Sequence, residues 1–143
     1  MALAAATPAD AAAGQNTVRD VLAIAVLVVE ARIAAVERRT ADALAKLREA
    51  VAAEDRLGYD EPKNWFFPAR HLLGAALLQA GEASEAERVY REDLRQSPAN
   101  GWSLYGLAEA LRASGKAAEA ARVEKEFEAA WTHADVRLTA SAF

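Results

Sequence analysis

The chain has 143 residues, of which 53% are hydrophobic and 27% charged, and its formal net charge is −4. It contains no cysteine, which excludes disulfide scaffolds, thiol nucleophiles and cysteine-ligated zinc. The 21 acidic residues outnumber the 17 basic ones, which argues against binding to nucleic acid, where concentrated positive charge is needed. Alanine supplies 38 residues, against 7 glycines and 4 prolines, so the composition predicts a single all-α domain.

The chain begins with an alanine-rich stretch, residues 1–15, that has no positively charged start and almost no bulky apolar side chain. We therefore expect a disordered tail rather than a secretory signal. A first helix is predicted over residues 17–38, with Thr17 and Asp20 as a capping box at its start. Its apolar run, Val21–Val29, is much shorter than the roughly 20 residues that cross a bilayer. The sequence thus predicts no membrane span and a cytoplasmic protein.

A second helix is predicted over residues 41–56, and a connector follows at residues 57–66. The segment from 59 to 67 holds four aromatic residues, namely Tyr59, Trp65, Phe66 and Phe67. A long connector with this content either fills the core or serves function as the wall of a binding pocket. So many aromatic rings are seldom exposed together, which favours the core. The later helices are expected over residues 66–80, 84–96, 101–113 and 117–131.

These later helices form a repeat. When the sequence is shifted by 34 residues, ten of the 20 positions from 73 to 92 are identical. Each unit has the pattern of two helices around a glycine turn, at Gly81 or Gly115, where a left-handed residue ends the first helix. Ser84 and Glu87 have the spacing of a capping box for the second helix, and Asn100 can cap the helix that follows.

The middle unit, residues 67–100, carries a spaced set of small, leucine and aromatic residues, namely Leu73, Gly74, Leu77, Gly81, Ala86, Tyr90 and Pro98. With this set the unit resembles a tetratricopeptide repeat, although Asp93 replaces the usual final alanine. The unit at 101–134 resembles it less closely, because Glu124 and Thr132 replace an aromatic residue and a proline. The resemblance is weakest in a degenerate unit at 17–56.

The resemblance implies an α-solenoid of about three helix pairs over residues 16–134, with a C-terminal tail at 135–143. The last unit and the tail also resemble the C-terminal end of larger bacterial tetratricopeptide proteins. The chain is then either a short relative of such proteins or a fragment of one.

We find no pattern that points to catalysis. The two histidines, His71 and His133, lie in different repeats and lack the spacing of metal ligands. No glycine-rich phosphate loop occurs. The serines at 84, 97, 103 and 114 fall at expected caps or turns, where bonds to the backbone explain them. We therefore expect no enzyme, no metal and no cofactor.

The resemblance implies that the first helices of the repeats line a groove that binds a polypeptide. By position, the candidate partner-binding residues are His71, Leu78, Gln79, Trp102, Tyr105, Glu109 and Arg112. Trp102 and Tyr105 either form a binding surface or pack on the connector or the preceding helix pair. We expect a scaffold that binds a protein or peptide. The alternative is a small-molecule-binding or enzyme-associated domain that uses residues 59–67 as a pocket wall.

The first helix is apolar around its whole circumference. One hairpin partner cannot cover all of this surface, so the N-terminal tail, the C-terminal segment or a second copy of the chain must cover the rest. We favour a symmetric homodimer through this helix. The candidate self-association residues are Val21, Leu22, Val28 and Val29.

Overall fold

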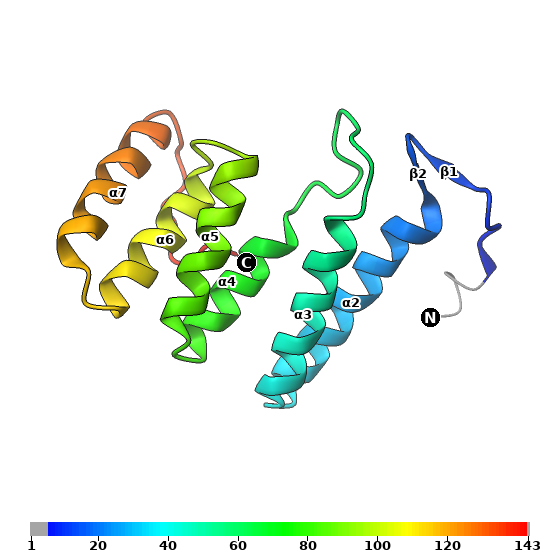
Figure 1. Cartoon of the computed structure of the whole chain (residues 1–143), viewed down its shortest axis with the longest axis horizontal. Coiled ribbons are helices and arrows are strands. Elements are labelled where there is room, and N and C mark those ends of the chain that lie inside the picture. The colour runs from blue at the N-terminus through cyan, green and yellow to red at the C-terminus, as the bar shows by residue number, and fades with distance from the viewer. Residues whose placement is uncertain (1–5, 143) are drawn as a thin grey trace. The chain divides into compact units, whose positions relative to one another are not determined.

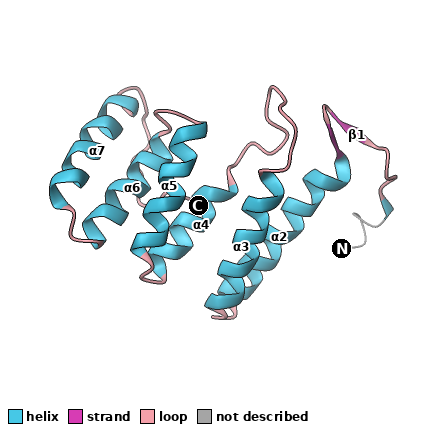
Figure 2. Ribbon diagram, viewed as in Figure 1, coloured by secondary structure: helices cyan, strands magenta, loops and turns pink. Residues whose placement is uncertain are grey.

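The computed structural model describes residues 6–142, and these are mainly helical (Figures 1 and 2). The helices are α2 (Val18–Val36), α3 (Thr40–Glu54), α4 (Ala69–Gln79), α5 (Ala83–Gln96), α6 (Gly101–Ala113) and α7 (Ala117–Ala130). Each begins and ends within three residues of its predicted bounds, so the all-α class is confirmed. Over residues 6–142, no helix has the combined length and apolar character needed to cross a bilayer.

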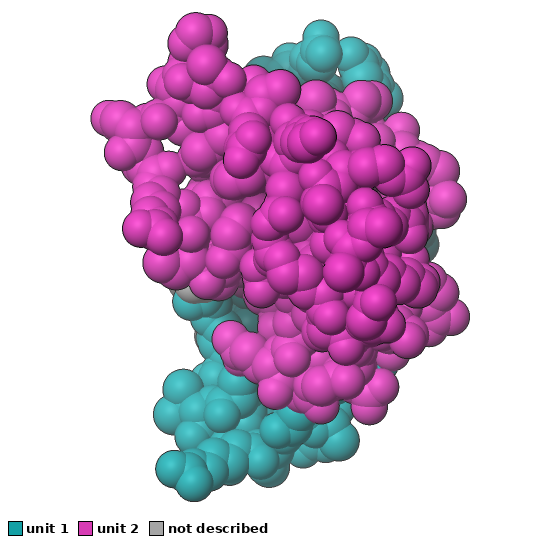
Figure 3. All heavy atoms as spheres, turned by 90° about the vertical axis from the view of Figure 1, so that its left-hand side faces the viewer, with its two compact units in different colours: residues 1–69 teal, residues 70–143 magenta. Residues whose placement is uncertain are grey.

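The chain divides into two compact units, residues 1–69 and 70–143 (Figure 3). The boundary falls at the first residue of α4, so the predicted connector, residues 57–66, belongs to the first unit.

The first unit is built on a hairpin of α2 and α3, which run antiparallel and pack along their length (Figure 1). Ile24 and Ala31 of α2 are buried, as are Leu47 and Ala50 of α3. Alanines among these residues let the two helices approach closely. The predicted cap of α2 is confirmed, because Thr17 Oγ1 accepts a hydrogen bond from the Asp20 amide at 3.1 Å.

A small polar contact holds the connector to the segment before α2. The strands β1 (Ala12–Ala13) and β2 (Asn16–Thr17) pair antiparallel. The Asn16 side chain donates to Gly58 O at 3.0 Å and to Asn64 Oδ1 at 2.6 Å, and accepts from Gly58 N at 2.6 Å. Of the expected disordered tail, residues 1–5 lie outside the described residues. The remainder leads into this hydrogen-bonded turn.

The aromatic residues of the connector do not form a core plug together. Tyr59 is 79% exposed and Phe66 is 86% exposed, whereas Trp65 and Phe67 are half-buried. The core expectation is therefore wrong for Tyr59 and Phe66. The physical reason is that hydrogen bonds from Asn16 hold the connector in place without burial of these two rings.

The second unit contains two hairpins, α4–α5 and α6–α7. Gly81 and Gly115 end the first helix of each hairpin, with φ of 80° and 75°. No atom lies within 4 Å of a Cβ built at either position, so backbone conformation rather than packing requires glycine there. The predicted left-handed turns are confirmed.

Of the two other predicted caps, one is confirmed. Asn100 Oδ1 accepts from the amides of Trp102 and Ser103, at 3.0 and 3.3 Å. The Ser84 capping box is wrong, because α5 begins at Ala83 and Ser84 lies inside its first turn. The N-cap residue is Glu82, which makes no side-chain cap hydrogen bond.

Candidate functional site

A cleft of about 340 Å³ lies between α4 and α6 in the second unit. It is lined by Ala75, Leu78 and Gln79 of α4, by Tyr105, Glu109 and Ala113 of α6, and by Thr139, Ala140 and Ser141 of the C-terminal segment. The chain thus places part of itself in the wall of its own cleft.

The C-terminal segment, residues 131–142, returns from the end of α7 across α6 to α4 (Figure 1). Trp131 Nε1 donates to Val136 O at 2.7 Å and fixes the start of this return. Leu138 and Ser141 are buried, at 7% and 2% exposed, whereas Val136 is 56% exposed. The hydrogen bonds of Ser141 are with α4 and α5, both helices of the second unit. Phe143 lies outside the described residues.

Ser141 is bound by a tyrosine that passes between two helices. The Ser141 hydroxyl forms hydrogen bonds with Tyr90 Oη and, at 3.5 Å, with the main-chain oxygen of His71. The Tyr90 ring is fully buried, and a Cβ built at Gly74 or Gly106 would lie 2.3 or 2.2 Å from its Cζ. The two glycines therefore leave the space through which Tyr90 of α5 reaches Ser141.

The Tyr90 phenol stays neutral in this position. Burial raises its pKa, and the hydrogen bond with Ser141 only partly offsets that effect. A buried phenol needs a hydrogen-bond partner to offset its loss of water, and Ser141 supplies it.

A buried polar cluster lies beside this site and connects three helices. Asp93 Oδ2 of α5 lies 3.1 Å from His71 Nε2 of α4 and accepts a hydrogen bond from Ser103 Oγ of α6 at 2.6 Å. All three residues are at most 3% exposed. Burial disfavours the ionised form of Asp93, but the hydrogen bonds from His71 and Ser103 outweigh it, and the pKa of Asp93 is lowered.

The geometry of this cluster differs from that of a nucleophilic serine. Ser103 donates to Asp93 and not to His71, so the histidine is not placed to take a proton from the hydroxyl. An ionised carboxylate only accepts hydrogen bonds, so His71 Nε2 is the donor to Asp93. The cluster joins α4, α5 and α6 behind the cleft.

Four of the seven predicted partner-binding residues line the cleft, namely Leu78, Gln79, Tyr105 and Glu109. The His71 side chain does not, because it is buried on Asp93, although its main-chain oxygen contacts Ser141. Arg112 forms ion pairs with Glu109 and with Glu124 of α7.

Trp102 and Tyr105 belong to an aromatic cluster between α6 and α7. The Trp102 ring meets Trp131 edge-on at 5.8 Å, and Tyr105 meets Phe127 at 5.7 Å. These two ring contacts are with α7 or with the residue that follows it. Tyr105 also lines the cleft, whereas Trp102 does not.

Sequence reasoning missed Tyr90 and Ser141 as site residues. The sequence identifies Tyr90 only as a position of the repeat pattern and indicates no site residue in the C-terminal tail. The sequence feature that could have indicated this site is Gly106, which occupies the position of Leu72 in the preceding unit. A glycine inside a helix often marks a place where another group approaches closely.

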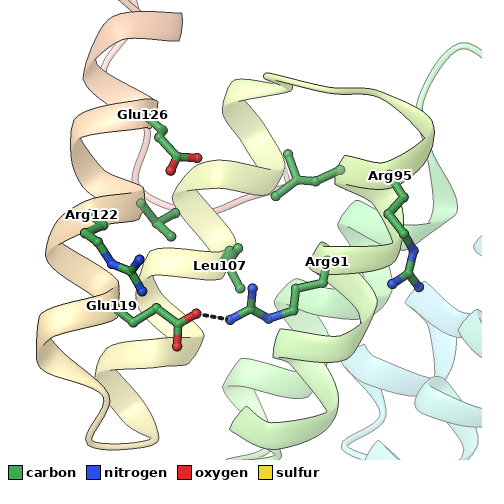
Figure 4. Close-up of a pocket in the computed structure, with 8 residues that line it drawn as sticks. Arg91, Arg95, Leu107, Glu119, Arg122 and Glu126 are labelled. Carbon is green, nitrogen blue, oxygen red and sulfur yellow. Dashed lines mark hydrogen bonds and ion pairs between the residues drawn. The ribbon is translucent and has the colours of Figure 1, made fainter.

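A second cleft, of about 440 Å³, crosses α5, α6 and α7. Arg91 reaches from α5 to Glu119 of α7, with Nη2 and Oε1 2.5 Å apart (Figure 4). Arg91 also pairs with Glu87, and Arg95 pairs with Glu92. Two of the arginines in this cleft are already paired with carboxylates. The cleft therefore gives no clear preference for an anionic or a cationic ligand.

The exposed apolar face of α2 lies nearer its C-terminal end than the predicted self-association residues do. Val29, Ile33 and Val36 are 55%, 51% and 85% exposed, and their spacing places them on one side of the helix. Of the four predicted self-association residues, Val29 is exposed, whereas Val21, Leu22 and Val28 are half-buried.

No protein-family model matches the chain, and no curated protein matches it. Within residues 6–142, no group of three or more histidine, aspartate or glutamate side chains is placed to hold a metal ion. The function must therefore be argued from the clefts and surfaces themselves.

Proposed function

We propose that the protein is a non-catalytic scaffold that binds an extended polypeptide segment in the cleft between α4 and α6. The observation that carries this proposal is that a non-helical segment of the chain, residues 139–141, already lies along the cleft and forms part of its wall. The Ser141 hydroxyl of this segment is hydrogen-bonded to α4 and α5, so the same surface has the chemistry to bind another extended segment.

The regularity of the second unit supports a tetratricopeptide-like architecture. The helices α5 and α7 begin at Ala83 and Ala117, 34 residues apart, and each follows a glycine with positive φ. In arrays of such hairpins the repeated first helices form a continuous binding surface, and α4 and α6 hold that position here.

The lining of the cleft suits a peptide. Ala75, Leu78 and Ala113 give it an apolar floor, and Gln79 and Glu109 place polar groups beside that floor. Sites of this kind combine apolar contact with a few polar groups that fix orientation. The alternative small-molecule pocket at the connector has less support, because Tyr59 and Phe66 are exposed.

We predict that Ala113→Arg weakens peptide binding by about tenfold or more, equivalent to about 1.4 kcal/mol. Ala113 is exposed at the end of α6 and lines the cleft, so a long side chain there obstructs the ligand without entering the core. Peptides would be selected from a random display library on the full-length chain, and their affinities measured by fluorescence anisotropy.

The matched control is Ala121→Arg, which places the same side chain on an exposed position of α7 outside the cleft. It should leave the affinities unchanged. If no peptide is selected, or if both variants bind every selected peptide as the wild type does, the α4–α6 cleft is not a peptide site.

The exposed face of α2 supports a second role, self-association. An antiparallel pair of α2 helices with its two-fold axis between Ala34 and Ala35 would place Ile33 opposite Val36 of the second copy. Arg32 and Glu37 flank this stripe on its two sides, so the contact between the two copies would be mainly apolar.

We predict that the wild type sediments as a dimer at tens of micromolar and that Ile33→Glu sediments as a monomer, because a carboxylate would be buried against an apolar face. Ala23→Glu is the control, since Ala23 is exposed on α2 away from this stripe. A monomeric wild type at high micromolar concentration would exclude the dimer.

A further inference from the structure

We infer that the site on the second unit that holds residues 138–142, beside the α4–α6 cleft, selects polypeptides with a large apolar residue followed three positions later by a serine. Residues 138–142 are then a built-in competitor that such a ligand displaces. This inference rests on the proposed function and specifies its ligand and its regulation. It is drawn from how Leu138 and Ser141 are held.

The apolar position follows from the burial pattern of the segment. Leu138 is 7% exposed, whereas Val136, two residues earlier, is 56% exposed. Arg137 and Thr139 are also exposed, so of the residues from 136 to 139 only Leu138 is removed from water. Transfer of that side chain out of water is the main apolar gain of docking.

The hydroxyl position follows from Tyr90. Its phenol is fully buried, passes through the space left by Gly74 and Gly106, and meets Ser141, which lines the cleft. An occupant that offers no polar group at the Ser141 position would leave this phenol without the partner that Ser141 provides. Ser141 is 2% exposed, so the position also excludes large side chains.

The segment is held in a way that permits exchange. It is not part of a helix, Thr139 is exposed, and Ser141 supplies side-chain hydrogen bonds to α4 and α5. A short tether keeps it at an effective concentration in the millimolar range. A ligand in solution therefore binds only the open fraction, and its apparent affinity is reduced by that fraction.

The test uses a fluorescent peptide with the sequence of residues 135–142, DVRLTASA, titrated against three forms of the full-length chain. Leu138→Asp, which charges the buried anchor and releases the segment, should bind the peptide about tenfold more tightly than the wild type. Val136→Asp carries the same charge at an exposed position of the same segment and should bind as the wild type does.

Changes in the peptide test the pattern itself. Replacing its leucine by aspartate, or its serine by valine, should weaken binding to the Leu138→Asp chain by about tenfold. Replacing its threonine by valine should have no effect, because Thr139 is exposed. Equal affinity of the wild-type and Leu138→Asp chains, or of the serine and valine peptides, overturns the inference.

Two further measurements keep the test decisive. Circular dichroism establishes whether each variant is folded. If Leu138→Asp is not, the NMR signals of the Leu138 methyl groups in the wild type replace it, because this side chain is 7% exposed. Excess peptide should then shift these signals, and unchanged signals overturn the inference. A wild-type dimer that Leu138→Asp converts to a monomer would show that the segment belongs in a second copy, and also overturns it.

The display selection separates this inference from the proposed function. Selected peptides that share the apolar-x-x-serine pattern support both. Selected peptides that are sensitive to Ala113→Arg but lack the pattern overturn the inference and leave the proposed function standing. If the selection gives no peptide whose binding is weakened by Ala113→Arg, the proposed function itself is wrong.

Discussion

Replacing Asp93 by alanine should lower the free energy of unfolding by about 2–6 kcal/mol, because two buried donors each lose their acceptor at a cost of about 1–3 kcal/mol apiece. The change leaves the His71 Nε2 donor and the Ser103 hydroxyl buried without the acceptor that they share. Three helices lose their common polar contact at once. Urea denaturation followed by circular dichroism gives the free energy directly.

Ser103→Ala is the matched control for this prediction. It removes one hydrogen bond to Asp93 and leaves the other, so we expect a loss of about 1 kcal/mol. If Asp93→Ala were as stable as Ser103→Ala, the cluster would not connect the helices in the way that the structure indicates.

The same carboxylate gives a pH dependence of stability. The pKa of Asp93 is lower in the folded chain than its usual value of about 4, so the folded state favours the ionised form. Its contribution to stability is therefore complete above the unfolded pKa and is lost as the pH falls through the folded pKa. The difference in unfolding free energy between wild type and Asp93→Ala should narrow below about pH 4.

Gly106→Ala should destabilise the wild type by about 1–3 kcal/mol, because the added methyl group would overlap the Tyr90 ring. In the Tyr90→Ala background the same substitution should instead stabilise, by up to about 1 kcal/mol, since alanine is the better helix former. Tyr90→Ala alone should cost about 3–5 kcal/mol. A double-mutant cycle with urea denaturation measures this reversal of sign.

Gly74→Ala should behave in the same way, because its added methyl group meets the same ring from the other helix. The control is Gly58→Ala in the connector, where an added Cβ makes only ordinary contacts, the nearest at 3.5 Å. A Gly106→Ala effect that is the same with and without the Tyr90 ring would show that the ring does not pass between these glycines.

Much of the fold could be predicted from the sequence because it depends on short-range order. Apolar spacing along one helix face, the glycines at 81 and 115, and the caps at Thr17 and Asn100 all act within a few residues. The 34-residue repetition then showed that the same hairpin occurs twice. Four of the seven candidate groove residues followed from their position in that repeat.

Only the tertiary structure decided what the departures from the pattern do. Asp93 stood out in sequence as a substitute for a small residue, but its role depends on His71 and Ser103, which come from two other helices. Tyr90 fits the repeat pattern, yet its hydroxyl reaches Ser141 because of Gly74 and Gly106. The Ser141 hydroxyl holds the C-terminal segment through partners 51 and 70 residues away in the chain, and no local periodicity encodes such contacts.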